Sequence, residues 1–150
     1  MTDGKLEEDY AKLVYEVRLY RKQLTILQRE IEKITLTSLD LTNALKTVGH
    51  IEKGESLIPI GGGSYAKGTI DEGDVLVAVG GGYLIEMDKH VAKEKLKART
   101  EATKTAINNL SEEFKKIAAK LEGVTMELKQ LERRILIDRR VEEGSSEDYR

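Results

Sequence analysis

The sequence predicts a mainly α-helical protein with a β insert: a long antiparallel two-helix coiled coil joined by two β-hairpins. Two long stretches carry apolar residues at alternating steps of three and four, which is the spacing of a coiled coil. A short segment rich in Gly and β-branched residues, 57–87, separates them. Charged residues make up 35% of the 150 residues and aromatic residues only 5%, which is typical of long helices rather than of a compact mixed core.

The first expected helix covers residues 6–49. Its apolar seam consists of Leu6, Tyr10, Leu13, Val17, Tyr20, Leu24, Leu27, Ile31, Ile34, Ser38, Leu41, Leu45 and Val48. Twelve of these thirteen positions are apolar or Tyr, whereas the whole chain is 39% hydrophobic. A period of 3.5 residues predicts a left-handed supercoil, and the charged residues between the seam positions form a solvated face. Gly49 would suit a left-handed cap at the end of this helix.

The second expected helix covers residues 88–141, with Asp88 as its N-cap. Its seam consists of Leu96, Thr100, Thr103, Ile107, Leu110, Phe114, Ile117, Leu121, Val124, Leu128, Leu131, Ile135 and Asp138. The remaining residues, 142–150, are polar and contain Gly and Ser, so we expect a disordered tail.

The two seams have the same length, because 48 − 6 and 138 − 96 both equal 42. They can therefore pair antiparallel within one chain, with partner numbers that sum to about 144. The expected pairs are Ile31 with Phe114, Leu27 with Ile117, Leu24 with Leu121, and Tyr10 with Ile135. A slip of one heptad and a parallel dimer of long helices are the alternatives. Thr100 and Thr103 should make the seam weakest next to the insert.

The insert is expected to form four strands, at residues 57–60, 65–70, 75–79 and 83–87. Two glycine triplets supply the hairpin turns, since Gly accepts positive φ: Gly61, Gly62 and Gly63, then Gly80, Gly81 and Gly82. Residues 71–74 connect the hairpins. Pro59 has no N–H for a sheet ladder, so it must lie at an edge or a bulge.

Two hairpins bury little apolar surface alone, and their open edges invite pairing with other chains. The helices should cover them poorly, because the helix seams are already paired with each other. We therefore expect strands from several subunits to close into a β-barrel platform, so that the insert is an assembly module. The expected assembly residues are Leu57, Ile58, Pro59, Ile60, Tyr65, Ile70, Val75, Val77, Val79, Tyr83 and Ile85.

Few residues suggest catalysis or cofactor binding. Gly61–Ala66 fits G-x-G-x-x-A, but no helix has room to follow it, and Lys67-Gly68-Thr69 has the wrong order for a phosphate-binding loop. The chain has no Cys, and neither His50 nor His90 has a second ligand at metal spacing. We therefore expect no metal, no cofactor and no catalytic residue; an enzyme that uses the glycine loops for nucleotide is the alternative.

The charge pattern argues against nucleic acid and membrane partners. The net charge is −2, and the basic groups at residues 93–99 and 133–140 are interleaved with acidic residues. The N-terminus lacks the apolar core of a signal peptide, and no apolar run reaches the ~18 residues of a membrane helix. We expect a cytoplasmic protein.

The insert resembles that of the prefoldin family, and specifically of archaeal α-type subunits. The resemblance lies in L-I-P-I-G-G-G-S-Y-A-K-G at residues 57–68 and V-A-V-G-G-G-Y-L-I-E at residues 77–86. It implies a hexamer of two α-type and four β-type subunits, whose hairpins build a double β-barrel carrying six coiled coils. Four strands rather than two imply the α type. The resemblance also implies an ATP-independent chaperone that captures unfolded proteins and delivers them to a group II chaperonin.

The ends of the two helices, where both chain termini lie, carry more apolar residues than a two-stranded seam needs. With Asp138 opposite Leu6, the pairing should fray and expose these residues to non-native client proteins, although each of them could equally be plain seam. The candidate client-binding residues are Leu6, Tyr10, Leu13, Val14, Val17, Leu131, Ile135, Leu136, Ile137 and Val141. The alternative function is a coiled-coil spacer or adaptor that holds two fixed partners apart.

Overall fold

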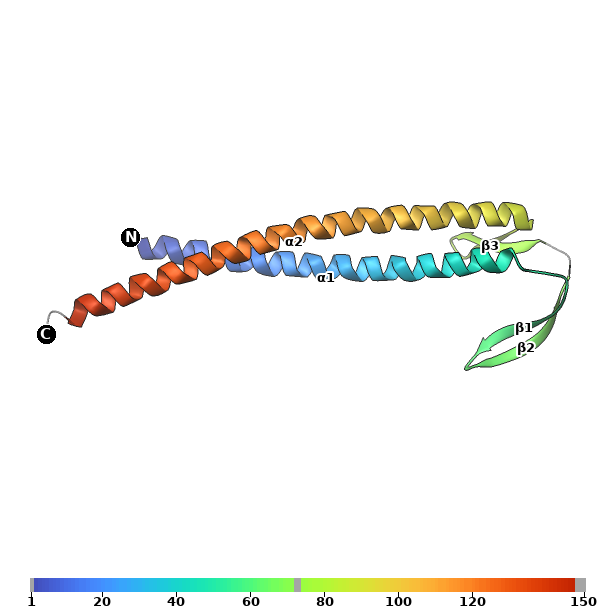
Figure 1. The fold of residues 1–150 in the computed structure, drawn as a ribbon, viewed down its shortest axis with the longest axis horizontal. Helices are drawn as coiled ribbons and strands as arrows, with labels where there is room; N and C mark the ends of the chain where they lie inside the picture. The colour runs from blue at the N-terminus through green and yellow to red at the C-terminus, as the bar shows by residue number, and fades with distance from the viewer. Residues whose placement is uncertain (1, 72–73, 148–150) are drawn as a thin grey trace. The chain divides into compact units, whose positions relative to one another are not determined.

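The computed structural model describes residues 2–71 and 74–147. The elements along the chain are α1 (Thr2–Val48), β1 (Gly54–Gly61), β2 (Ser64–Ile70), β3 (Val75–Gly80), β4 (Tyr83–Met87) and α2 (Lys89–Glu147) (Figure 1). Long helices pack together and two antiparallel hairpins lie between them in the sequence, which confirms the predicted fold class. The chain divides into two compact units. The terminal unit comprises Met1–Lys33 and Asn108–Arg150, and the central unit comprises Ile34–Ile107.

Both helices are longer than the seams that predicted them. Helix α1 begins at Thr2, and α2 continues to Glu147. The expectation of a disordered tail is therefore wrong for residues 142–147. The hydroxyls of Ser145 and Ser146 donate to the carbonyls of Glu142 and Glu143, at 3.1 and 2.9 Å, so the serines bond to their own helix. The last three residues of the expected tail, and residues 72–73 of the expected connection, lie outside the described residues.

The predicted seams are the faces that the helices bury. All thirteen seam positions of α1 are buried or half-buried, with Val17, Leu27 and Val48 the most enclosed. In α2 the same holds for every seam position except Asp138, which is exposed. Apolar positions at a period of 3.5 residues therefore face a partner helix, as a coiled coil requires.

The register agrees with partner numbers that sum to about 144. In the terminal unit Tyr10 and Ile135 line one pocket, and Leu13 and Leu131 line another. In the central unit Val48 and Leu96 belong to one apolar cluster. The helices thus pair antiparallel within one chain and without a heptad slip at these places. The other three expected pairs stay predictions.

The core of the central unit joins the helix ends to the second hairpin. It contains Val48 of α1, Val77 of β3, Met87 of β4, and Ala92 and Leu96 of α2. Ala92 is completely buried, and its small side chain lets neighbouring elements approach closely. One turn beyond Leu96, Thr100 is also buried, and its hydroxyl donates to the Leu96 carbonyl at 2.8 Å. Thr100 is the only polar residue that is buried among the described residues, and this bond gives its hydroxyl a hydrogen-bond partner.

Capping differs between the two helix ends that flank the hairpins. The carboxylate of Asp88 accepts from the Val91 amide at 2.8 Å, which confirms the predicted N-cap of α2. Gly49 does not have the left-handed backbone expected after α1. The ring Nδ1 of His50 instead donates to the Lys46 carbonyl at 2.7 Å and satisfies a carbonyl of the last turn. A ring nitrogen facing a carbonyl oxygen must carry the proton.

Gly123 is a weak point in the middle of α2. It has a negative φ, is exposed, and a Cβ added there would meet no atom within 4 Å. We expect Gly123→Ala to raise the free energy of unfolding by about 0.5–1 kcal/mol, because Ala loses less backbone entropy on folding. Thermal unfolding of the full chain, followed by circular dichroism, measures this. Gly62→Ala is the control and should lower the free energy of unfolding, since Gly62 has a φ of +59°. Equal changes in the free energy of unfolding for the two substitutions would contradict the explanation.

Candidate functional site

The two glycine triplets form hairpin turns of the same geometry. Gly62 and Gly63 have φ of +59° and +74°, and Gly81 and Gly82 have +62° and +80°. Positive φ at both central residues is what a type I′ turn requires. In each hairpin the register shifts just before the turn, between Pro59 and Gly61 and between Ala78 and Gly80. Strands follow both triplets, so they are turns and not helix-opening phosphate loops, and Pro59 lies beside a bulge as predicted.

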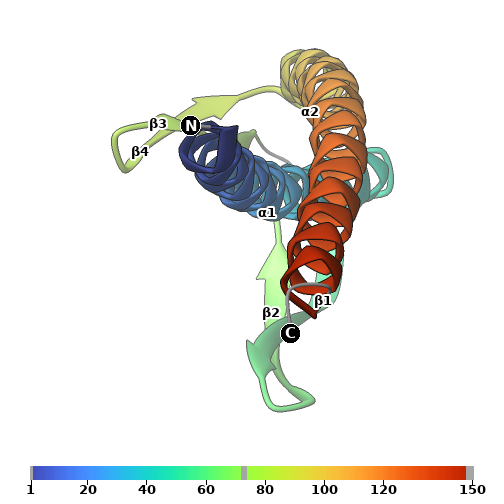
Figure 2. The same ribbon diagram turned by 90° about the vertical axis from the view of Figure 1, so that its left-hand side faces the viewer.

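The hairpins are separate two-stranded sheets. Strand β1 pairs with β2, and β3 pairs with β4, each antiparallel (Figures 1 and 2). The described residues place no third strand beside either hairpin, so each strand has one edge without a ladder partner. Such edges are templates for pairing with strands of another chain.

The chain's own helices cover one face of the β3–β4 hairpin. Val77 is 6% exposed and Met87 is 8% exposed, and both pack in the core of the central unit. The expectation that the helices leave the hairpins uncovered is therefore wrong for this face. Val77 belongs to the chain's own core rather than to a free assembly surface, and Val75 is half-buried beside it.

The opposite face of this hairpin is open. The neighbour of Val77, Leu76, is 65% exposed, because successive side chains of a strand point to opposite faces. Leu84 pairs with Ala78, so it lies on the same face as Leu76, and it is 58% exposed. Near the turn Tyr83 is 75% exposed, and Val79 and Ile85 are exposed as well, although Ile85 pairs with Val77 and so lies on the face that the helices cover farther from the turn. Of these residues, Leu76 and Leu84 were not among the expected assembly residues.

The β1–β2 hairpin has no residue in the central core, and most of its apolar side chains face outward. Leu57, Ile58, Ile60 and Tyr65 are each more than half exposed, and Pro59 is also exposed, whereas Ile70 at the end of β2 is half-buried. A hydrogen bond of 2.7 Å from Lys89 Nζ to the Ile51 carbonyl links the segment before β1 to the start of α2. Exposed apolar surface of this kind is typical of interaction sites.

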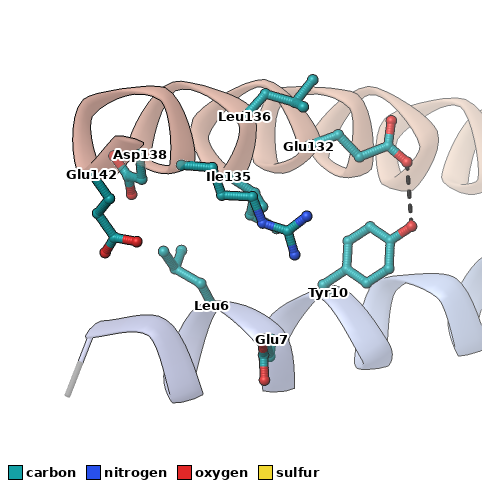
Figure 3. A pocket seen from close by; sticks show the side chains of 9 residues that line it. Leu6, Glu7, Tyr10, Glu132, Ile135, Leu136, Asp138 and Glu142 are labelled. Atoms are coloured by element: carbon teal, nitrogen blue, oxygen red, sulfur yellow. Dashed lines mark hydrogen bonds between the residues drawn. The ribbon is translucent and has the colours of Figure 1, made fainter. Parts of the chain in front are cut away.

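A pocket opens between α1 and α2 in the terminal unit (Figure 3). Its apolar lining comes from Leu6, Tyr10, Ile135 and Leu136. The Tyr10 hydroxyl donates to Oε1 of Glu132 at 3.4 Å, and the Leu6 side chain extends toward α2. Four of the predicted client-binding residues thus come together at one place.

The other predicted client-binding residues have different surroundings. Leu13 and Leu131 line a second, more polar pocket of the terminal unit, and Val14 is half-buried. Val17 is 7% exposed and is simply a seam residue. Ile137 and Val141 are 60% and 66% exposed. The helix is intact there, so these side chains are exposed without the predicted fraying.

Reasoning from the seam placed Asp138 opposite Leu6 but missed the other charged residues around the first pocket. Glu132, Asp138, Arg139 and Glu142 line it from α2, and Glu7 lines it from α1. A signal was present, because residues three, four and seven positions from Ile135 lie on its side of a helix. Such positions look like an ordinary solvated face until the partner helix is placed.

Within residues 2–71 and 74–147, no three His, Cys, Asp or Glu side chains are grouped so that they could bind a metal ion. Neither described helix has an apolar stretch of the length and charge content needed to cross a membrane.

These features define a class of protein: a two-helix coiled coil that carries two exposed β-hairpins and has an apolar pocket near its chain ends. The sequence profile of the prefoldin subunit matches residues 20–134, so the chain belongs to the prefoldin family. Membership in this family implies a chaperone subunit.

Two relatives extend the comparison. Prefoldin subunit alpha of Methanococcus aeolicus is 32% identical over 63 residues, which are 41% of this chain and 44% of that relative's length. The matched stretch thus spans less than half of the relative. The fold is similar to that in the cryo-EM structure of filamentous PFD from Methanocaldococcus jannaschii, with a TM-score of 0.61, 23% identity, and coverage of 74% of this chain and 96% of that one.

Proposed function

We propose that this chain is the α-type subunit of a prefoldin complex, expected to contain two α-type and four β-type subunits. The β-hairpins are its assembly surfaces. Support comes from the four strands with unpaired edges and from the apolar side chains that they expose, among them Leu57, Ile60, Leu76 and Tyr83. Closing such strands into barrels with neighbouring subunits removes the edges and buries the apolar faces.

The complex acts, in this proposal, as an ATP-independent holdase in the cytoplasm. It captures non-native proteins at the ends of its coiled coils and transfers them to a group II chaperonin. The single observation that carries the capture step is the pocket of the terminal unit, where Leu6, Tyr10, Ile135 and Leu136 line an opening between the helices. Several such ends acting together bind one extended client more tightly than any one of them.

Assembly is tested by mixing the full chain with a β-type prefoldin subunit and measuring the mass of the product. A discrete mass equal to two copies of this chain and four of the partner is the expected result. A chain that stays monomeric in the presence of the partner contradicts the assembly proposal. A broad ladder of large masses would instead indicate an open, filament-like assembly.

Capture is tested by the aggregation of several unrelated denatured proteins, with and without ATP. The holdase proposal expects the complex to suppress aggregation of all of them to the same extent in both conditions. A spacer or adaptor would bind one partner saturably and protect none of them. Replacing Gly62 and Gly81 by Ala should weaken assembly without revealing any nucleotide affinity, because these glycines serve turns. Measured ATP binding would favour the enzyme alternative.

A further inference from the structure

The pocket of the terminal unit has a strongly acidic rim. Its volume is about 550 Å³, which is large enough to enclose a bulky side chain together with its neighbours. Around the apolar lining stand four carboxylates, from Glu7, Glu132, Asp138 and Glu142, and one guanidinium, from Arg139. Four negative charges and one positive charge leave a formal charge of −3 at a site that is otherwise apolar.

These carboxylates are available to a partner. Among residues 2–71 and 74–147, Lys104 pairs with Glu101, Lys115 pairs with Glu112, and the His90 ring contacts Glu94, but no carboxylate of the pocket belongs to an ion pair. Glu132 accepts only the 3.4 Å hydrogen bond from Tyr10 within that part of the chain. Figure 3 shows the carboxylates of Asp138 and Glu142 beside the Leu6 side chain, so negative charge borders the apolar surface directly.

We propose that this pocket binds an apolar side chain flanked by Lys or Arg in an extended segment of a non-native protein. The proposal rests on the function proposed above and specifies its ligand. The apolar side chain contacts Leu6, Ile135 and Leu136, while the flanking cations lie against the carboxylates of the rim. A segment with the same apolar residue flanked by Asp or Glu would bring like charges together and bind more weakly.

The test compares two labelled extended peptides that share their apolar residues and differ only in flanking Lys or Glu. Binding to the assembled complex is followed by fluorescence anisotropy at low and high salt. We expect the Lys peptide to bind roughly fivefold more tightly at low salt, because a few exposed ion pairs each contribute a small factor. The preference should shrink at high salt, since screening weakens exposed pairs.

The matched variants separate charge from apolar contact. Glu132→Gln, Asp138→Asn and Glu142→Gln combined should remove the preference for Lys. The control combines Glu30→Gln, Glu113→Gln and Glu122→Gln, which neutralise three exposed carboxylates of the same unit outside the pocket and should leave the preference unchanged. Circular dichroism confirms that both variants keep their helices.

The outcomes distinguish this inference from the function on which it rests. If both peptides bind equally well and Leu136→Ser weakens both, client capture stands and the charge preference is overturned. If Leu136→Ser changes neither peptide's binding, this pocket captures no clients and both proposals fail here. If the full chain alone associates with itself and the triple Glu132, Asp138 and Glu142 variant abolishes that association, the occupant is a second copy, and the proposal is overturned.

Discussion

Replacing Val77 by Asp is expected to lower the free energy of unfolding of this chain by about 3 kcal/mol or more, whereas Leu76→Asp should leave it nearly unchanged. The two residues are neighbours on β3, but Val77 is 6% exposed and Leu76 is 65% exposed. The Val77→Asp change would place a carboxylate without a partner in the apolar cluster that contains Met87 and Ala92. The carboxylate introduced by Leu76→Asp would stand in solvent.

Assembly should respond to both changes for different reasons. Leu76→Asp puts a charge on the hairpin face that we propose to be covered by a neighbouring subunit, so the complex should fail to form although the chain is folded. Val77→Asp should weaken the complex because the hairpin loses its attachment to the helices. Denaturant unfolding of the full chain, and the mass after mixing with a β-type subunit, measure the two effects. Equal loss of stability in both variants would show that the faces of β3 are wrongly assigned.

Removing residues 1–16 and 133–150 should abolish the suppression of aggregation while the complex keeps its mass. The deletion takes away Leu6, Tyr10, Ile135 and Leu136, which form the apolar lining of the pocket. The hairpins and their core belong to the central unit, Ile34–Ile107, which the deletion leaves intact. Much of the seam also remains, from Val17 onward in α1 and up to Leu131 in α2.

The matched control removes only residues 143–150. This shorter deletion keeps every residue that lines the two pockets, because the last of them is Glu142. We expect the control to protect denatured proteins as well as the full chain does. Light scattering of aggregating clients at increasing chaperone concentration measures the difference, which should reach at least tenfold in the concentration needed. Undiminished protection by the longer deletion would refute capture at the chain ends.

Much of the fold follows from local pattern. The heptad spacing from Leu6 to Val48 identified the buried face of α1, because side chains at steps of three and four line one side of a helix. Equal seam lengths predicted the register that joins Tyr10 to the neighbourhood of Ile135. The end of α2 was predicted less well. A composition rich in Ser and Gly suggested disorder, but Ser145 and Ser146 bond to their own helix.

The candidate sites were predicted only in part. The apolar residues near the chain ends could be recognised from the sequence, because they are more numerous than the seam of a two-helix coiled coil requires. Apart from Asp138, their acidic surroundings could not, since Glu132 and Glu142 look like ordinary solvent-facing positions in a chain of which 35% of the residues are charged. Tyr10 comes from α1 and Glu132 from α2, so only the packing of the helices brings these two side chains into one pocket.

The sequence by itself determined the two long helices, their buried faces and the position of both hairpin turns, because each depends on spacing or on residues that accept positive φ. It favoured the antiparallel register over a heptad slip or a parallel dimer but did not decide between them. Only the tertiary structure decided which face of the second hairpin belongs to the chain itself. Val75 to Val79 is apolar on both faces, and a period of two does not say which face meets the helices. The completely buried Ala92 and its neighbours settle that choice by packing against Val77, which leaves Leu76 free for a partner.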